Sequence, residues 1–372
     1  MTRKLTWLLS NLLFIYRRNF NDIVELLTYD YLDSSSSDSS DDDLCELLLE
    51  TAFAPKQKLG PHLNLQDISD DNCENMFRFQ KDDMDRLLHA LEIPDHYICS
   101  QGTSSSGMES LMIMLRRLSY PNRWIDLVPV FGRSQFELSV IFNEIVDDIY
   151  ERYKELLTSL DLVWLDPEMF SQVIHAKGSP LTQCWGFIDG TPRGIARPIY
   201  NQRIMFSGHK RIHCLKFQSV QAPNGLIAHM FGPIEGRRHD AFMLGMSDLL
   251  PELQRLVKPN GEPYVLYGDP AYGISQNILA PFRGANLTAD EQEFNRAMSK
   301  VRVSVEWGFG KIVQNFAFLD FKKNLKVLLQ PVAKYYLVST ILTNCHTCLY
   351  GSLVSSFFDL NPPSLESYLS NQ

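Results

Sequence analysis

The 372 residues are 45% hydrophobic and 11% aromatic, which is enough to bury a substantial core and excludes a chain that is disordered overall. Seven cysteines, odd in number and dispersed, exclude a disulfide framework and indicate reduced thiols in an intracellular protein. The net charge of −9 is uneven: residues 185–325 hold 17 basic against 12 acidic residues, so a nucleic-acid-binding core is not excluded.

The first segments of the chain carry no globular pattern. Residues 1–32 predict an N-terminal helical piece, because the apolar run from Leu5 to Tyr16 is too short to span a bilayer and lacks a clear cleavage site. Residues 33–43 contain only Ser and Asp, so we expect a disordered acidic linker. With no secretory or membrane signal, we expect no membrane partner and a location in the nucleus or cytoplasm.

A helical domain is predicted over residues 74–175. The spacing of apolar residues predicts helices over Met108–Leu118 and Gln135–Tyr150, the second one capped by Ser134 after a turn. This arrangement is typical of a helix-turn-helix. The second helix, however, carries only acids toward solvent, which favours packing or a protein partner over DNA readout: Glu137, Glu144, Asp147 and Asp148.

From Cys184 onward the pattern changes to that of an α/β fold. An apolar run ends on Asp189, and a hairpin turn at Pro223-Asn224-Gly225 joins two further strands. Thr288 and Glu291 have the spacing of a capping box at the start of a long helix that reaches about Phe316. The predicted elements are strands over Cys184–Asp189, Ile212–Gln221, Leu226–Phe231 and Tyr264–Asp269, with a helical stretch over 239–256 between the last two.

Three acids lie where such a fold could assemble a metal site. Asp189 and Asp269 each end a predicted strand, and Glu306 lies on the flank of the long helix. Ligands bind at the carboxyl ends of strands in α/β sheets, and two Mg²⁺ or Mn²⁺ ions held by carboxylates support phosphodiester hydrolysis. Each acid also has a structural alternative, and for Glu306 this is an ion pair with Arg302 at i, i+4.

Four ordered blocks within roughly residues 75–350 resemble the signatures of PIF/Harbinger transposases and their domesticated nuclease relatives, which are DDE superfamily endonucleases. The blocks are Trp185-Gly-Phe-Ile-Asp189-Gly-Thr, Gly236-Arg-Arg-His239-Asp240, Tyr267-Gly-Asp269-Pro-Ala-Tyr272 and Arg302-Val-Ser-Val-Glu306-Trp-Gly-Phe-Gly310. The chain departs from the family at Pro192, where His is usual, at Gly273, where Pro is usual, and after Lys311, where further basic residues are usual.

The resemblance implies an RNase H-like core over 184–350, followed by a C-terminal tail over 351–372. It also implies Asp189, Asp269 and Glu306 as a catalytic triad that binds two divalent ions, DNA as substrate, a nuclear location and a separate Myb-like DNA-binding partner. A homo-oligomer stays open. His239 and Asp240 are expected to support the metal ligands or to cap a helix. Lys210, Arg211, Arg302 and Lys311 are candidates for the DNA backbone or for supporting the site.

Three functions stay open at this stage. An active transposase or endonuclease is favoured by the retention of all three carboxylates. A domesticated, catalytically inactive scaffold in chromatin is favoured by the thinned basic block after Gly310, because each lost phosphate contact weakens DNA binding. A phosphohydrolase for small substrates has no supporting glycine loop. The pair Cys345 and Cys348 is a weak candidate for a metal or redox site.

Overall fold

The protein is described by a computed structural model that places residues 59–99 and 102–370. The expected helical piece at 1–32 and the acidic linker at 33–43 lie outside these residues. From Pro61 onward the chain forms one compact unit. Among the described residues, no helix combines the length and the apolar character that crossing a bilayer requires.

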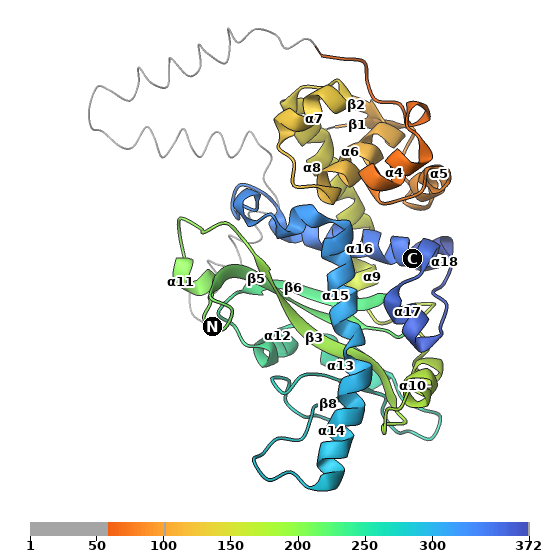
Figure 1. Cartoon of the computed structure of the whole chain (residues 1–372), viewed down its shortest axis with the longest axis vertical. Coiled ribbons are helices and arrows are strands. Elements are labelled where there is room, and N and C mark those ends of the chain that lie inside the picture. Colours follow the sequence, from red (N-terminus) through yellow and green to blue (C-terminus); the bar gives the residue numbers. More distant parts are fainter. Residues whose placement is uncertain (1–58, 100–101, 371–372) are drawn as a thin grey trace, which may run out of the picture. The chain divides into compact units, whose positions relative to one another are not determined.

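The first part of this unit is helical (Figure 1). Helix α8 begins as predicted, because the Ser134 hydroxyl accepts a hydrogen bond from the Glu137 amide while the Glu137 carboxylate accepts one from the Ser134 amide. The elements, after a 3₁₀ turn at Leu65–Asp67, are α4 (Asp70–Phe77), α5 (Lys81–Ala90), β1 (His96–Ile98), β2 (Ser104–Ser106), α6 (Gly107–Ser119), α7 (Trp124–Phe131), α8 (Gln135–Tyr153), α9 (Glu155–Thr158) and α10 (Pro167–Ala176).

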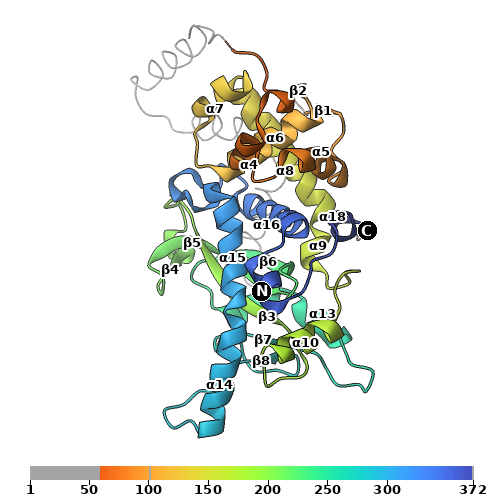
Figure 2. The same cartoon turned by 45° about the vertical axis from the view of Figure 1, so that its right-hand side comes forward.

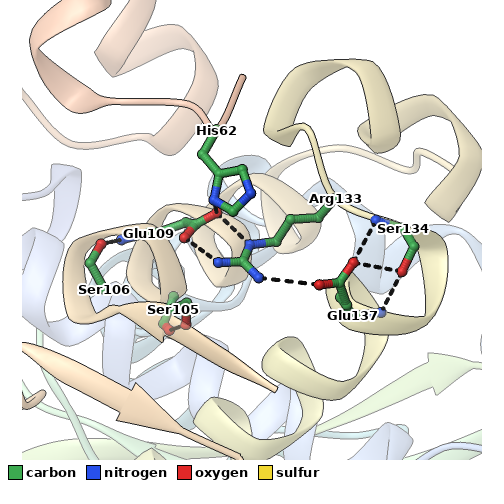
Figure 3. A network of polar contacts seen from close by, with 8 residues as sticks. His62, Ser105, Ser106, Glu109, Arg133, Ser134 and Glu137 are labelled. Atoms are coloured by element: carbon green, nitrogen blue, oxygen red, sulfur yellow. Dashed lines mark hydrogen bonds and ion pairs between the residues drawn. The ribbon is translucent and has the colours of Figure 1, made fainter. Parts of the chain in front are cut away.

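A buried ion pair holds the turn between α7 and α8 against α6 (Figure 3). The Arg133 guanidinium donates to both carboxylate oxygens of Glu109, at 2.6 and 2.7 Å, and the two side chains are only 6% and 7% exposed. His62 approaches the same carboxylate to 3.5 Å. Because the charge of Arg133 is neutralised inside the protein, it is not available to a phosphate, which favours the packing interpretation of this segment.

The second part of the unit is a mixed sheet with strand order β4–β5–β3–β7–β8, in which β6 also pairs with β5. Strands β3, β7 and β8 run parallel, while β5 is antiparallel to both β3 and β6. This mixed α/β arrangement is compatible with an RNase H-like nuclease fold. The strands are β3 (Cys184–Gly194), β4 (Phe206–Ser207), β5 (Ile212–Gln221), β6 (Ile227–Glu235), β7 (Val265–Tyr267) and β8 (Ile278–Leu279).

Strand β3 is longer than the sequence predicted. Asp189 does not end it but lies at its middle, opposite Ser219 of β5, and the pairing continues to Gly194 opposite Cys214. The physical reason is that β5 provides an antiparallel partner along this whole stretch, which satisfies the backbone groups of residues that could otherwise form a turn. Strand β5, in contrast, has the predicted bounds.

The predicted long helix is two helices, α14 (Ala289–Arg302) and α15 (Ser304–Asn315), which follow each other almost in line (Figure 2). The predicted capping box at Thr288 and Glu291 is present. One row of apolar side chains along these helices and just after them is buried: Val301, Val305, Phe309, Ile312 and Phe316. The other helices are α11 (Gln202–Met205), α12 (Asp240–Met246), α13 (Leu249–Arg255) and α16 (Val332–Tyr350), with 3₁₀ turns at Ala317–Asp320 and Lys322–Asn324.

The stretch expected as a C-terminal tail contains two packed helices, α17 (Leu353–Phe358) and α18 (Leu365–Leu369). Tyr368 is fully buried, and its hydroxyl accepts a hydrogen bond from the Asn344 side chain of α16 at 3.0 Å. Glu366 accepts two hydrogen bonds from Arg86 of α5. The end of the described chain is thus joined to both the helical part and the sheet part of the unit.

Candidate active site

Two of the predicted acids occupy corresponding positions relative to two neighbouring parallel strands. Strands β3 and β7 run parallel with Phe187 opposite Tyr267, and Asp189 and Asp269 each follow two residues later. Asp269 comes after β7 has ended, and its carboxylate accepts a hydrogen bond from the Ala271 amide in the turn that follows. The negative charge of Asp269 is one of those that act on Asp189.

Asp189 is largely enclosed, with 17% of its side chain exposed. Its Oδ1 lies 3.2 Å from Nη2 of Arg302 and accepts a hydrogen bond from the Gly190 amide at 2.9 Å. Burial raises the pKa of Asp189 to about 6. The positive charge of Arg302 lowers this pKa, whereas the negative charges of Asp269 and Asp240 raise it. A carboxylate in such surroundings is stabilised by any cation that replaces its lost hydration.

Asp240, in the first turn of α12, is a third carboxylate, and its negative charge acts on Asp189. A Cβ atom at Gly190 would lie 3.0 Å from Oδ1 of Asp240, so the absence of a side chain at Gly190 makes this approach feasible. Lys216 Nζ lies 3.4 Å from the same oxygen and donates a hydrogen bond to the Arg238 carbonyl at 2.7 Å. His239 occupies the cap position of α12, but its side chain makes no capping hydrogen bond.

Tyr272 adds a buried polar group to these aspartates. Its side chain is 1% exposed, and a Cβ atom at Gly268 would lie 3.0 Å from the ring, which therefore packs directly on that glycine. Within the described residues the phenol oxygen has no hydrogen-bond partner. Burial raises the pKa of Tyr272, and Asp240, Asp189 and Asp269 raise it further. An unpartnered hydroxyl thus lies in the field of all three carboxylates.

Glu306, the third predicted ligand, is in the first turn of α15 and is exposed. Its expected alternative partner, Arg302, pairs with Asp189 instead. Helix α15 contacts β3, but in the part of the chain that the structure describes no three His, Cys, Asp or Glu side chains lie close enough to hold one metal ion. The charges of Asp269 and Asp240 act on Asp189, whereas Glu306 is left at the surface.

The remaining candidates lie elsewhere. Lys311 donates hydrogen bonds to the Gly351 carbonyl at 2.6 Å and the Thr347 hydroxyl at 2.9 Å at the end of α16, and burial lowers its pKa to about 8. Lys210 and Arg211 are exposed between β4 and β5. Cys345 and Cys348 are free thiols whose pKa values burial raises. A cavity of about 1090 Å³ opens beside His62, Glu109 and Arg133, and no site aspartate lines it.

Comparison with known proteins finds a match for the same region. Residues 188–344 match the family described as DDE superfamily endonuclease, and this span includes Asp189, Asp269 and Glu306. Neither a curated protein nor a solved structure matches the chain. The family supports a nuclease or transposase that acts on DNA, and its members typically use divalent metals.

The oxygen atoms of these carboxylates are of the chemical type that binds divalent metal ions. Mg²⁺ and Mn²⁺ prefer carboxylate oxygens, and every acid of this site supplies them. The raised pKa of Asp189 indicates that its negative charge lacks full compensation from Arg302. Two residues near the site were not assigned to it from the sequence. Lys216 lies on β5, and Tyr272 lies in the turn after β7. For Tyr272 the available signal was its position three residues after Asp269.

Proposed function

We propose that this chain is a divalent-metal-dependent DNA endonuclease or transposase of the DDE type. The observation that carries the proposal is the position of Asp189 and Asp269, each two residues beyond the paired Phe187 and Tyr267 of the parallel strands β3 and β7, inside the region that matches the DDE endonuclease family. Two carboxylates at this edge of the sheet would serve as oxygen ligands for hard divalent cations.

Asp189, Asp269 and Glu306 are the proposed ligands of two Mg²⁺ or Mn²⁺ ions. When bound, such ions supply an activated water and neutralise charge on the leaving oxygen. The side chains of the protein neutralise charge and orient the reacting groups. Arg302 neutralises the charge of Asp189. Once a metal ion binds the Asp189 carboxylate, the guanidinium of Arg302 is free to bind a phosphate oxygen. Lys216 pairs with Asp240, whose negative charge also acts on Asp189.

The signature blocks support a finer assignment to the PIF/Harbinger type. On that assignment we propose a nuclear location, strand transfer of the freed 3′ end after cleavage, and a separate Myb-like protein that recognises the DNA sequence. The buried charge of Arg133 supports the need for such a partner, because the helix-turn-helix-like segment offers little positive charge to DNA.

The test is cleavage of supercoiled DNA that carries the terminal repeats flanking the chain's own gene. Purified full-length protein is incubated with Mg²⁺ or Mn²⁺, with and without the Myb-like partner, and nicked and linear products are separated. We expect metal-dependent products with the wild type and none with Asp269→Asn, which retains the size of the side chain but removes its charge. Equal products from both proteins would eliminate the DDE mechanism.

The second candidate is a catalytically inactive chromatin scaffold, and one observation favours it. Arg302 already occupies the Asp189 carboxylate, so the site is electrostatically satisfied in part without a metal. On this hypothesis the wild type binds DNA but yields no cleavage products with any metal or partner. Metal-dependent nicking by the wild type that Asp269→Asn lacks would exclude the scaffold as the sole function.

A further inference from the structure

Eight exposed basic residues gather at the outer edge of the sheet, around β4, α11 and the start of β5. We call this surface the basic edge. From residue 191 to residue 213 the chain contains five basic residues and no acid. The members of the basic edge are Arg197, Arg203, Lys210, Arg211, Arg237, Lys322, Lys323 and Lys326.

Backbone hydrogen bonds bring these residues together from three separate parts of the chain. The Ala196 amide donates to the Leu325 carbonyl at 3.0 Å, which joins the segment after β3 to the lysines near 322–326. The Arg237 amide donates to the Ile204 carbonyl at 3.2 Å, which joins the end of β6 to α11. Figure 1 shows α11 beside β5, the strand that begins directly after Arg211. The basic edge is therefore one surface.

The positive charge of the basic edge is not neutralised inside the protein. Among the described residues, none of its eight members forms an ion pair with a carboxylate. The nearby acids Asp320 and Glu235 pair with Arg193 and Arg238, neither of which belongs to the basic edge. Eight uncompensated cations on a chain of net charge −9 indicate a surface selected by an anionic partner.

The basic edge also has a defined distance from the candidate active site. Strand β3 carries Asp189 at its middle and ends at Gly194, against which the Lys322 side chain packs. Five residues of strand at about 3.3 Å each give about 17 Å between Asp189 and the near margin of the basic edge. One turn of B-DNA is about 34 Å, so this separation is about half a turn.

We infer that the basic edge binds the phosphate backbone of duplex DNA, about half a helical turn from the phosphodiester that lies at Asp189. The inference rests on the proposed function for the position of the reacting phosphodiester at Asp189. It adds the surface along which the rest of the duplex lies. Continuity with the carboxylates through β3 favours DNA over an acidic peptide, because one rigid strand then fixes both the reacting phosphate and its distal contact. The exposed side chains of Ile199 and Tyr200, between Arg197 and Arg203, provide apolar contact area on the same surface.

The experiment measures binding without cleavage. Full-length protein is titrated into a fluorescein-labelled duplex in EDTA, and anisotropy gives the affinity at several salt concentrations. The test variants are Lys323→Gln/Lys326→Gln and, from the separate segment that follows β3, Arg197→Gln/Arg203→Gln. The matched control is Arg283→Gln/Lys300→Gln, which removes the same charge from exposed positions before and on α14. Thermal unfolding checks that each variant is folded.

We expect each test variant to bind roughly tenfold more weakly at moderate salt and to lower the slope of log K against log [salt] by about 1 to 2, since each lost phosphate contact removes about 0.9 from that slope. The control should bind like the wild type. Test variants that bind like the control, a wild type that does not bind the duplex, or tighter binding of polyglutamate than of the duplex would each overturn the inference.

The outcome is independent of catalysis. If the basic edge governs binding but the wild type never cleaves, the nuclease proposal fails and the binding surface remains. If the wild type cleaves in a manner that requires Asp269 and the test variants still bind like the control, the nuclease proposal remains and the basic edge is excluded.

Discussion

The guanidinium of Arg302, in the last turn of α14, lies 3.2 Å from the carboxylate of Asp189 at the middle of β3. This contact spans 113 positions of the chain and joins the helix that precedes Glu306 to the strand that carries the first proposed ligand. Because a guanidinium and a divalent ion satisfy the same oxygens, occupation of Asp189 by Arg302 and by a metal should compete.

Replacing Arg302 with Gln should therefore strengthen metal binding. We expect the Mg²⁺ concentration that gives half of the maximal thermal stabilisation, measured at pH 8 without DNA, to fall several-fold, since ligands that bind the folded state stabilise it by mass action. Arg296→Gln on the same helix is the control, because Arg296 pairs with the exposed Glu293. An unchanged Mg²⁺ midpoint in the Arg302 variant would contradict competition at Asp189.

The pKa of Asp189 predicts a pH-dependent difference in stability. Its folded pKa of about 6 lies above the ordinary value of 3.8, so between these values the folded state holds more protons than the unfolded state and loses stability as pH rises. The Asp189→Asn variant has no carboxyl group at this position, so it does not lose stability in this way as pH rises. In EDTA, the free energy of unfolding of the variant minus that of the wild type should rise between pH 4 and pH 7, by up to about 3 kcal/mol at about 1.4 kcal/mol per pKa unit.

Urea denaturation at the two pH values measures this difference. Comparison between pH values removes the constant effect of the substitution on packing and on Arg302. A difference that stays level across the range would mean that Asp189 titrates in the folded protein near its ordinary value.

Replacing Glu306 with Gln separates the enzyme from the scaffold. The substitution retains size and hydrogen-bonding capacity but removes the charge proposed to hold one ion. We expect cleavage to fall at least on the order of a hundred- to thousand-fold, as when one preorganised electrostatic group is lost. Binding of DNA in EDTA should stay equal or tighten slightly, because a negative charge near phosphate has gone.

The control for this experiment is Glu293→Gln on α14, another exposed carboxylate that makes only a local ion pair. Cleavage by Glu306→Gln at the rate of the control would remove Glu306 from the proposed triad and direct attention to Asp240, whose negative charge acts on Asp189.

Two buried tyrosines should respond in opposite directions to replacement by Phe. The hydroxyl of Tyr272 has no partner among the described residues, so Tyr272→Phe should leave the free energy of unfolding unchanged or raise it by up to about 2 kcal/mol in EDTA. Tyr368→Phe removes an acceptor from Asn344 and should lower it by about 1 to 2 kcal/mol. Chemical denaturation measures both. A marked loss of stability in Tyr272→Phe would reveal a hydrogen bond of that hydroxyl.

The sequence predicted the local elements well because their signals are local. The helix cap at Ser134, the capping box at Thr288 and the bounds of β5 are present as expected, since each depends on residues a few positions apart. The middle position of Asp189 in β3 could not be predicted in the same way. It depends on how far β5 extends as a partner, and a Gly-Thr pair after an acid is compatible with a turn or with a strand.

The candidate site was predictable only in part for the same reason. Asp269 was expected near Asp189 because parallel strands end at one edge. The approach of Asp240 depends on the space above Gly190, and the pairing of Arg302 depends on the path of α14 across the sheet. Those contacts join residues about 50 to 110 positions apart, and no periodicity in the sequence reports them.

The antiparallel pairing of Asp189 with Ser219 restricts which length changes the chain can tolerate. Successive strand residues point to opposite faces, so one residue inserted or deleted between Phe187 and Asp189 would turn the carboxylate away from Asp269 while leaving the sheet itself intact. The same change at the hairpin tip near Asn224 would shift no strand residue of β3. Natural and engineered variants that differ in length should therefore differ at that tip, whereas the distance in sequence from Phe187 to Asp189 should be invariant among active proteins.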